Sequence, residues 1–119
     1  MVIGRYEAIS KIYFMMIKPL NNCGVVYILT NKNHTVLYTG VTSDLFVRIQ
    51  QHISKYYSES FTAKYNATKL VYYKVFDSIE SAIIEEKRIK GGSRQKKNDL
   101  INELNPQWND LWLIDVSKW

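Results

Sequence analysis

The stretch that decides the fold is residues 24–41, GVVYILTNKNHTVLYTGV. Residues 25–29 and 36–41 within it are rich in β-branched and aromatic side chains, which are typical of strands. Residues 31–34 (NKNH) between them have the composition of a turn. The pattern predicts an antiparallel hairpin. Because both strands are apolar on both sides, we expect another layer to cover each face of the sheet.

A helix and a third strand are predicted after the hairpin. The helix follows the candidate N-caps of residues 42–44 (TSD) and extends to about Ser54. Its apolar residues recur at four-residue spacing, at Leu45, Ile49 and Ile53. A polar loop that carries Ser and Tyr comes next, and residues 69–76 (KLVYYKVF) then have the composition of a strand.

Two further helices are predicted before an aromatic-rich end. The first begins after residues 77–78 (DS) and ends at residues 91–92 (GG), since glycine commonly ends a helix. Its apolar stripe is Ile79, Ala82, Ile83 and Ile89. The second begins at Ser93 and ends at residues 105–106 (NP). The element order is therefore ββαβαα, that of a small mixed α/β (α+β) domain.

Length and composition allow one globular domain. The chain has 119 residues, of which 46% are hydrophobic and 23% charged. We expect residues 1–22 to be an N-terminal extension, 23–112 the domain and 113–119 a C-terminal tail; a short helix or added strand over residues 6–17 stays open. The single cysteine, Cys23, excludes an internal disulfide framework. The early apolar stretch, residues 12–17, has only six residues, so we expect neither a membrane helix nor a signal peptide. We expect a cytoplasmic location.

The positive charge is concentrated in one segment. The net charge is +5, and six of the sixteen basic residues lie between positions 87 and 97. They are Lys87, Arg88, Lys90, Arg94, Lys96 and Lys97. Such a cluster is either a solvated helix face or a stripe that contacts phosphates of a nucleic acid.

Three polar side chains fall on the apolar faces of the predicted helices. Successive helical residues are about 100° apart, which places Arg48 and His52 on the stripe of the first helix. By the same geometry Glu86 faces inward on the second helix, whereas its neighbour Glu85 lies on the flank. A buried Arg48–Glu86 salt bridge, or long side chains that reach water from the edge of each stripe, is one interpretation, and the helical positions alone favour it over a functional site.

The alternative is a hydrolytic site. Arg48, His52 and Glu86 come from two helices and would lie beside Tyr27 and Tyr38 of the hairpin. A carboxylate can hold a divalent cation, an arginine can neutralise charge on a phosphorane-like transition state, and a phenolate or imidazole can take a proton from water. This set of groups is suited to phosphodiester hydrolysis.

The spacing of these residues resembles the GIY-YIG nuclease superfamily. The matching segments are Val26-Tyr27, Tyr38-Thr39-Gly40, Thr42 to His52 (TSDLFVRIQQH), Ala82 to Lys90 (AIIEEKRIK), Ser93 to Lys97 (SRQKK) and Leu104 to Trp108 (LNPQW). The later segments are similar to its small stand-alone branch, which is related to the N-terminal nuclease domain of the repair protein UvrC. The resemblance covers about residues 24–111. It implies a three-stranded antiparallel sheet flanked by helices.

The resemblance also implies roles for individual residues. Tyr27 would orient or deprotonate the attacking water, and Tyr38 would line the same pocket. Arg48 would stabilise the transition state while His52 assists proton transfer. Glu86 would ligate one Mg²⁺ or Mn²⁺, and Asn105 would help to hold that carboxylate or the substrate. Lys87, Lys90, Arg94, Lys96 and Lys97 would contact DNA.

One departure from the family pattern concerns the general base. Some relatives carry a lysine directly after the glycine that Gly40 matches, where this chain has Val41. Activation of Tyr27 would then depend on the metal, on His52, or on a lysine from elsewhere such as Lys64.

The resemblance leads to a metal-dependent endonuclease that cuts DNA, in repair or recombination, with selectivity for structure or single strands. One alternative is a binding module of the same fold without useful activity, which holds DNA or a protein partner. Another is an interaction domain that uses Trp108, Trp112 and Trp119 as a homodimer or partner patch, although a packing role for these tryptophans is favoured.

Overall fold

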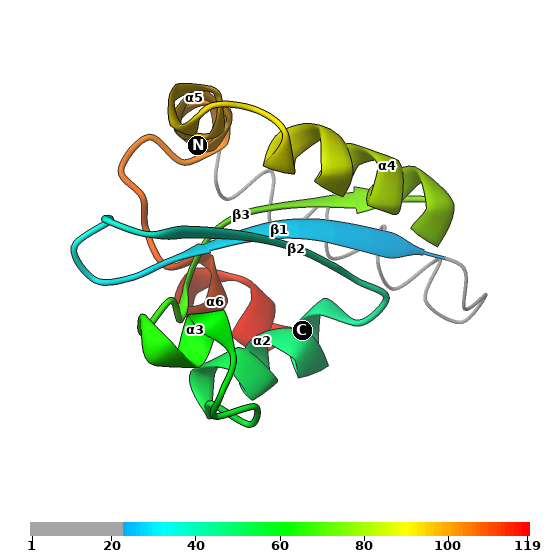
Figure 1. Ribbon diagram of the computed structural model, residues 1–119. Coiled ribbons are helices and arrows are strands. Elements are labelled where there is room, and N and C mark those ends of the chain that lie inside the picture. Colours follow the sequence, from blue (N-terminus) through cyan, green and yellow to red (C-terminus); the bar gives the residue numbers. More distant parts are fainter. Residues whose placement is uncertain (1–22) are drawn as a thin grey trace.

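A three-stranded antiparallel sheet forms the centre of the domain (Figure 1). The computed structural model describes residues 23–119, and the predicted N-terminal extension with its possible helix or strand lies outside them. The strands, in the spatial order β2-β1-β3, are β1 (Gly24–Thr30), β2 (Leu37–Thr42) and β3 (Lys69–Phe76). The helices are α2 (Leu45–Ile53), α3 (Phe61–Lys64), α4 (Ile79–Lys90), α5 (Arg94–Leu104), α6 (Leu111–Ile114) and the 3₁₀ helix η2 (Val116–Lys118). The predicted fold class is confirmed.

Both faces of the sheet are covered, as the apolar character of the strands predicts. Figure 1 shows α4 and α5 on one face and α2, α3 and α6 on the other. Every residue of β1 is buried. Its side chains alternate between the two faces of the sheet. Val25, Tyr27 and Leu29 face the core on the side of α6. Val26 and Ile28 face the core on the side of α4 and α5. The sheet therefore separates two apolar cores.

The helix boundaries follow from their caps. Asp44 accepts a hydrogen bond from the Val47 amide at the start of α2. Ser78 and Ser93 cap α4 and α5 in the same way. Gly91 ends α4 as predicted. Within residues 23–119, no helix has the length and apolar character needed to cross a bilayer.

The C-terminal residues predicted as a tail belong to the core. Asp115 and Val116 are buried, and the Tyr73 hydroxyl donates a hydrogen bond to the Asp115 carboxylate. Trp119 Nε1 donates to the same carboxylate over 3.2 Å, and its ring contacts Tyr73 edge-on. The domain thus continues through η2 instead of ending at residue 112.

Two apolar residues assigned to buried stripes are exposed. Ile53 ends α2 and is 40% exposed, and Ile83 is 36% exposed because α4 buries the row Ala82, Glu86 and Ile89 instead. The three tryptophans follow the favoured prediction. Trp108 packs against one core, and Trp112 and Trp119 pack against the other.

Candidate active site

Tyr27 crosses beneath β2 to meet a histidine of α2. Its ring is buried, and its hydroxyl lies 2.9 Å from Nε2 of His52. Tyr27 pairs with Gly40 in the sheet, and a Cβ atom at position 40 would lie 2.5 Å from Cζ and Oη of the phenol. Only glycine at position 40 therefore leaves room for the Tyr27 ring, so the matching segments Val26-Tyr27 and Tyr38-Thr39-Gly40 fit together sterically.

The second nitrogen of His52 is held by α3. Nδ1 lies 2.8 Å from Oγ1 of Thr62, a buried residue whose hydroxyl is also 3.2 Å from Oγ of the α3 N-cap, Ser60. If Nδ1 donates its proton to Thr62, Nε2 is left to accept the hydrogen bond from Tyr27. The sequence prediction had a loop here and did not include Thr62. The only sequence signal was a serine in position to cap a single helical turn.

Burial sets the charge of both groups. Burial, together with Tyr38, raises the pKa of Tyr27 above its usual value, and the positive charge of Arg48 opposes this only in part. Burial and the same Arg48 lower the pKa of His52 to about 4. At neutral pH the pair is therefore an uncharged phenol and an uncharged imidazole. Such an imidazole can accept a proton.

The lowered pKa of His52 predicts a measurable pH dependence. Between pH 6.5 and 4 the unfolded chain binds a proton at this residue that the folded chain does not, so the free energy of unfolding falls as the pH falls through this window. We expect the His52 ring proton to titrate near pH 4 by NMR, with His34→Gln used to assign the two histidines. A His52 midpoint at or above 6.5 would contradict the lowering of its pKa by burial and Arg48.

Tyr38 contacts this pair, and the charges of Arg48 and Glu86 act on it. Tyr38 lies with its ring centroid 6.3 Å from that of Tyr27 and 5.6 Å from that of His52. Arg48 is half-buried one turn before His52, and its charge acts on both Tyr27 and His52. The charge of Glu86, from α4 on the other layer, also acts on Tyr27. Tyr38 thus contacts the Tyr27–His52 pair, and the charges of Arg48 and Glu86 act on Tyr27.

The salt bridge considered from the sequence does not form. In the part of the chain that the structure describes, no ion pair joins Arg48 to Glu86. Glu86 instead lies 2.8 Å from Nζ of Lys90, whose side chain is 52% exposed. The inward orientation of Glu86, at 9% exposure, is confirmed, while Glu85 pairs with Arg88 at the surface.

Glu86 has the properties of a single protein ligand for a hard cation. Residues 23–119 contain no group of three or more His, Cys, Asp or Glu side chains that could enclose a metal ion. Mg²⁺ and Mn²⁺ do not need such a group, because Mg²⁺ typically uses one or two carboxylates and takes its other ligands from water and phosphate. The exposed Lys90 can move away from the carboxylate. The donor set therefore fits a cation held mainly by substrate and solvent.

Asn105 does not belong to this site. Its Nδ2 donates to the backbone oxygens of Val71 (3.0 Å) and Asn109 (2.9 Å), and its Oδ1 accepts from the Asn109 amide (3.0 Å). The residue is 1% exposed. With its polar atoms used by the backbone, its side chain fastens the end of α5 to β3 and is not available to Glu86 or to a substrate. The predicted role is corrected accordingly.

Replacing Asn105 by alanine should therefore cost stability. Asn105→Ala leaves buried backbone groups without partners, and we expect the free energy of unfolding to fall by about 3 kcal/mol, with the thermal midpoint lower by about 10 °C. Asn102→Ala, which removes only an exposed bond from Trp108, is the matched control and should cost less than about 1 kcal/mol. An unchanged thermal midpoint together with an altered metal affinity would show that Asn105 acts in the candidate active site.

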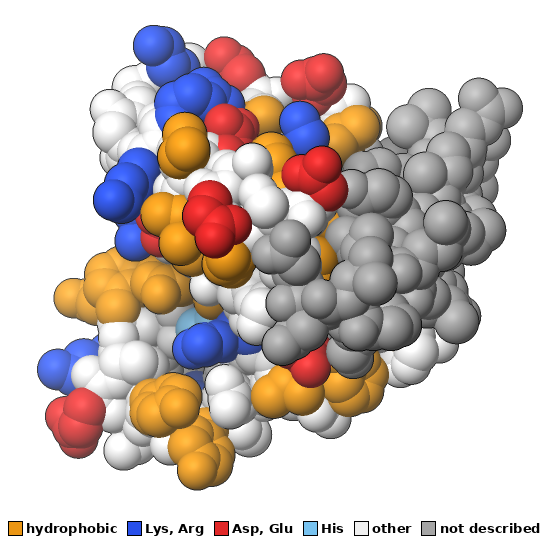
Figure 2. Space-filling model, turned by 90° about the vertical axis from the view of Figure 1, so that its right-hand side faces the viewer, with side chains coloured by type: hydrophobic (Ala, Val, Ile, Leu, Met, Phe, Trp, Pro, Cys, Tyr) orange, Lys and Arg blue, Asp and Glu red, His pale blue; other side chains and the backbone are white. Residues whose placement is uncertain are grey.

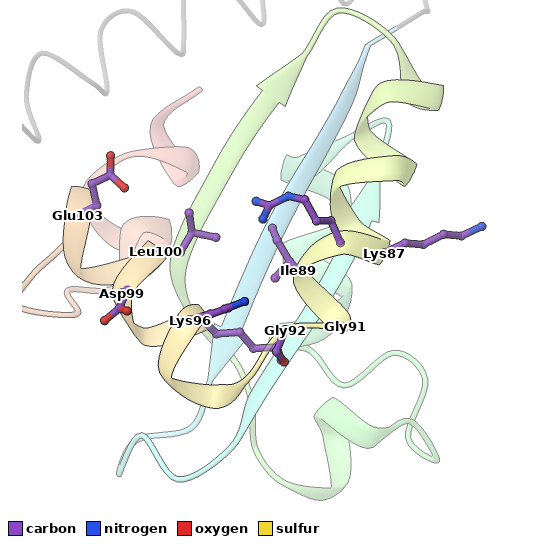
Figure 3. A pocket seen from close by; sticks show the side chains of 10 residues that line it. Lys87, Ile89, Gly91, Gly92, Lys96, Asp99, Leu100 and Glu103 are labelled. Atoms are coloured by element: carbon purple, nitrogen blue, oxygen red, sulfur yellow. The ribbon is translucent and has the colours of Figure 1, made fainter.

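The basic residues 87–97 do not form one uniform stripe, because some of them bond to backbone oxygens of the domain. Arg94 binds the backbone oxygens of His34 and Thr35 and so holds the β1–β2 turn, and Lys97 donates to the Gly92 carbonyl. A surface groove of about 570 Å³ lies between α4 and α5, and Figure 3 shows Lys96 directed into it and Lys87 away from it. Asp99 and Glu103 also line this groove. On the face drawn in Figure 2, Lys and Arg side chains are likewise mixed with acidic and apolar ones.

Comparison with known proteins places the chain in a family. The family model of the GIY-YIG catalytic domain matches residues 23–99. A UPF0213 protein of Syntrophus aciditrophicus is 38% identical over 82 residues, which cover 69% of this chain and 92% of the relative. A UPF0213 protein of Staphylococcus saprophyticus is 37% identical over 78 residues, 66% of this chain and 93% of the relative. The solution NMR structure of a UPF0213 protein of Bacillus halodurans has 31% sequence identity and a TM-score of 0.49, over 74% of this chain and 92% of that one.

The match extends over more than half of the chain and includes β1, β2, α2, β3 and α4. These elements carry Tyr27, Tyr38, Arg48, His52 and Glu86. The chain therefore belongs to the GIY-YIG catalytic domain family, a nuclease family.

Proposed function

We propose that this protein is a divalent-metal-dependent endonuclease that hydrolyses DNA phosphodiester bonds, in repair or recombination. The observation that carries the proposal is the 2.9 Å contact between the Tyr27 hydroxyl and Nε2 of His52, beside Arg48 and Glu86. An uncharged phenol bonded to an uncharged imidazole is a route for a proton. The positive charge of Arg48 suits the phosphodiester, and the carboxylate of Glu86 suits its metal ion.

Tyr27 and His52 together serve as the base. As the attacking water loses its proton, the Tyr27 oxygen accepts it while the phenolic proton passes to Nε2 of His52. Thr62 keeps Nδ1 occupied, so it acts as a positioning residue that turns Nε2 toward the phenol. Among the three candidates for activating Tyr27, the contact distance supports His52, since Lys64 is exposed and has no hydrogen bond to Tyr27 in the described residues.

Arg48 acts on the phosphate. Its charge lies next to Tyr27 and is free of carboxylate partners among residues 23–119, so it can stabilise the negative charge that develops on the phosphoryl oxygens. Tyr38 lines the same space. Glu86 would hold one Mg²⁺ or Mn²⁺, which supplies Lewis-acid stabilisation of the phosphate and the leaving oxygen. Lys87 and Lys96 would meet the DNA backbone.

Cleavage of labelled DNA tests the proposal. Single-stranded, duplex and branched substrates are incubated with the protein in Mg²⁺, in Mn²⁺ and in EDTA, and internal fragments are expected only with a metal ion. Binding of the same substrates is measured in EDTA. Binding without cleavage of any substrate would support the alternative, an inactive DNA-binding module of the same fold.

A further inference from the structure

A row of aromatic rings leads from the candidate site to the surface. Tyr38 stacks on Phe61 with ring centroids 6.2 Å apart and planes inclined by 28°, and Phe61 lies 4.7 Å from Tyr65. Tyr38 contacts Tyr27 and His52 at the inner end. We name these three residues, Tyr38, Phe61 and Tyr65, the aromatic row.

The outer rings of the aromatic row are not used by the core. The buried residues of α3 are Thr62 and Ala63, whereas Phe61 is 45% and Tyr65 52% exposed. Thr62 is bonded to His52, which fixes this short helix against α2. The side chains that anchor α3 therefore differ from those it presents to solvent. An exposed group of aromatic rings beside a site is typical of a surface that binds a ligand.

The chain segment that carries the outer rings of the aromatic row is basic. Residues 48–69 contain four cationic side chains and one acidic side chain, namely Arg48, Lys55, Lys64, Lys69 and Glu59. Aromatic rings among positive charges match the two parts of a nucleotide, a flat base and a phosphate.

We propose that the aromatic row stacks the unpaired bases next to the scissile phosphate, so the substrate is single-stranded DNA. The inference rests on the proposed function, because it places the phosphate at Tyr27 and Arg48. In a duplex each base already stacks on its neighbours and its face is not available to a protein ring. In a single strand the bases are free to stack on Tyr38, Phe61 and Tyr65 in turn, whatever their identity. The row therefore selects strandedness and not sequence.

Binding in EDTA tests the aromatic row without requiring cleavage. Fluorescence anisotropy is measured with labelled dT12, with a duplex of equal length, and with a dT12 analogue whose central residues are abasic. The wild type should prefer dT12 over the duplex. The abasic strand keeps every phosphate and should bind roughly tenfold more weakly than dT12.

Variants identify the residues responsible. Phe61→Leu and Tyr65→Leu should each weaken dT12 binding roughly tenfold and leave duplex binding within about twofold. Phe61→Tyr and Tyr65→Phe keep the rings and should bind as the wild type does. The matched control is Tyr56→Leu with Tyr57→Leu, which removes two exposed tyrosines of the same segment outside the row and should leave dT12 binding unchanged.

The outcomes separate this inference from the proposed function. Equal affinity for dT12 and duplex, or leucine variants that bind dT12 normally, would overturn the role of the aromatic row even if the protein cuts DNA. Loss of binding in the Tyr56 and Tyr57 control alone would overturn it as well. If binding of dT12 depends on the rings but the protein cuts none of the substrates, the role of the aromatic row would be supported and the proposed nuclease function contradicted.

Discussion

Tyr27→Phe is expected to reduce metal-dependent DNA cleavage by about 10²- to 10⁴-fold, the usual contribution of a positioned acid–base group. The change removes one oxygen and leaves the buried ring and its contact with Gly40 in place. Because the only hydrogen bond lost among the described residues is that to His52, the cost in stability should be about 1 kcal/mol. Single-turnover cleavage and thermal unfolding measure the two effects.

Tyr72→Phe is the matched control. Tyr72 is as buried as Tyr27, its pKa is also raised by burial, and it faces the opposite core. We expect this variant to cleave DNA at close to the wild-type rate. Full activity in Tyr27→Phe would show that another group accepts the proton from water.

Arg48→Ala should lower the cleavage rate by about 10²- to 10³-fold, since removal of one group that stabilises transition-state charge has an effect of this size in other enzymes. Its binding of DNA in EDTA should fall much less, because Arg48 is expected to act chiefly on charge that develops during the reaction. The Arg48→Lys variant keeps the charge but loses the planar, bidentate guanidinium, so it should recover only part of the rate. Rate constants at saturating DNA separate the effect on the cleavage step from the effect on DNA binding.

Arg88→Ala serves as the comparison for this change. Arg88 is exposed and bonded to Glu85 on the surface of α4, so its loss should leave cleavage nearly unchanged. If Arg48→Ala weakened DNA binding and left the rate at saturation intact, Arg48 would be a binding residue with no special action on the transition state.

The long elements were predictable because local and tertiary preferences agree in them. The third strand was predicted at residues 69–76, which are the observed bounds of β3. The predicted caps and the glycine after α4 also match. By contrast, α3 and α6 have four residues each, about one turn, which is too short for an apolar period to be recognised. Thr62 of α3 bonds to His52, and Leu111 of α6 packs in the core, so tertiary contacts hold both turns.

The site was predictable in its helical positions and not in its contacts. Helix geometry placed Arg48, His52 and Glu86 on inward faces, and the described structure agrees. The role of Thr62 depends on a turn that brings it back to His52 from ten residues away. The partners of Arg94 lie 59 and 60 residues away in sequence, and no periodicity encodes such a pairing. Asn105 was misassigned for the same reason, since its partners are backbone groups.

In the proposed mechanism the inward carboxylate of α4 supports hydrolysis at Tyr27 and Arg48. The most direct test compares Glu86→Gln with Glu85→Gln, two adjacent changes that are identical in chemistry and differ in orientation. Cleavage of labelled single-stranded DNA is measured over a range of Mg²⁺ and Mn²⁺ concentrations. We predict that Glu86→Gln lowers the rate roughly a thousandfold, while Glu85→Gln keeps the rate and the metal dependence of the wild type. Equal cleavage by the two variants, with unchanged metal dependence, would show that Glu86 does not hold the metal ion.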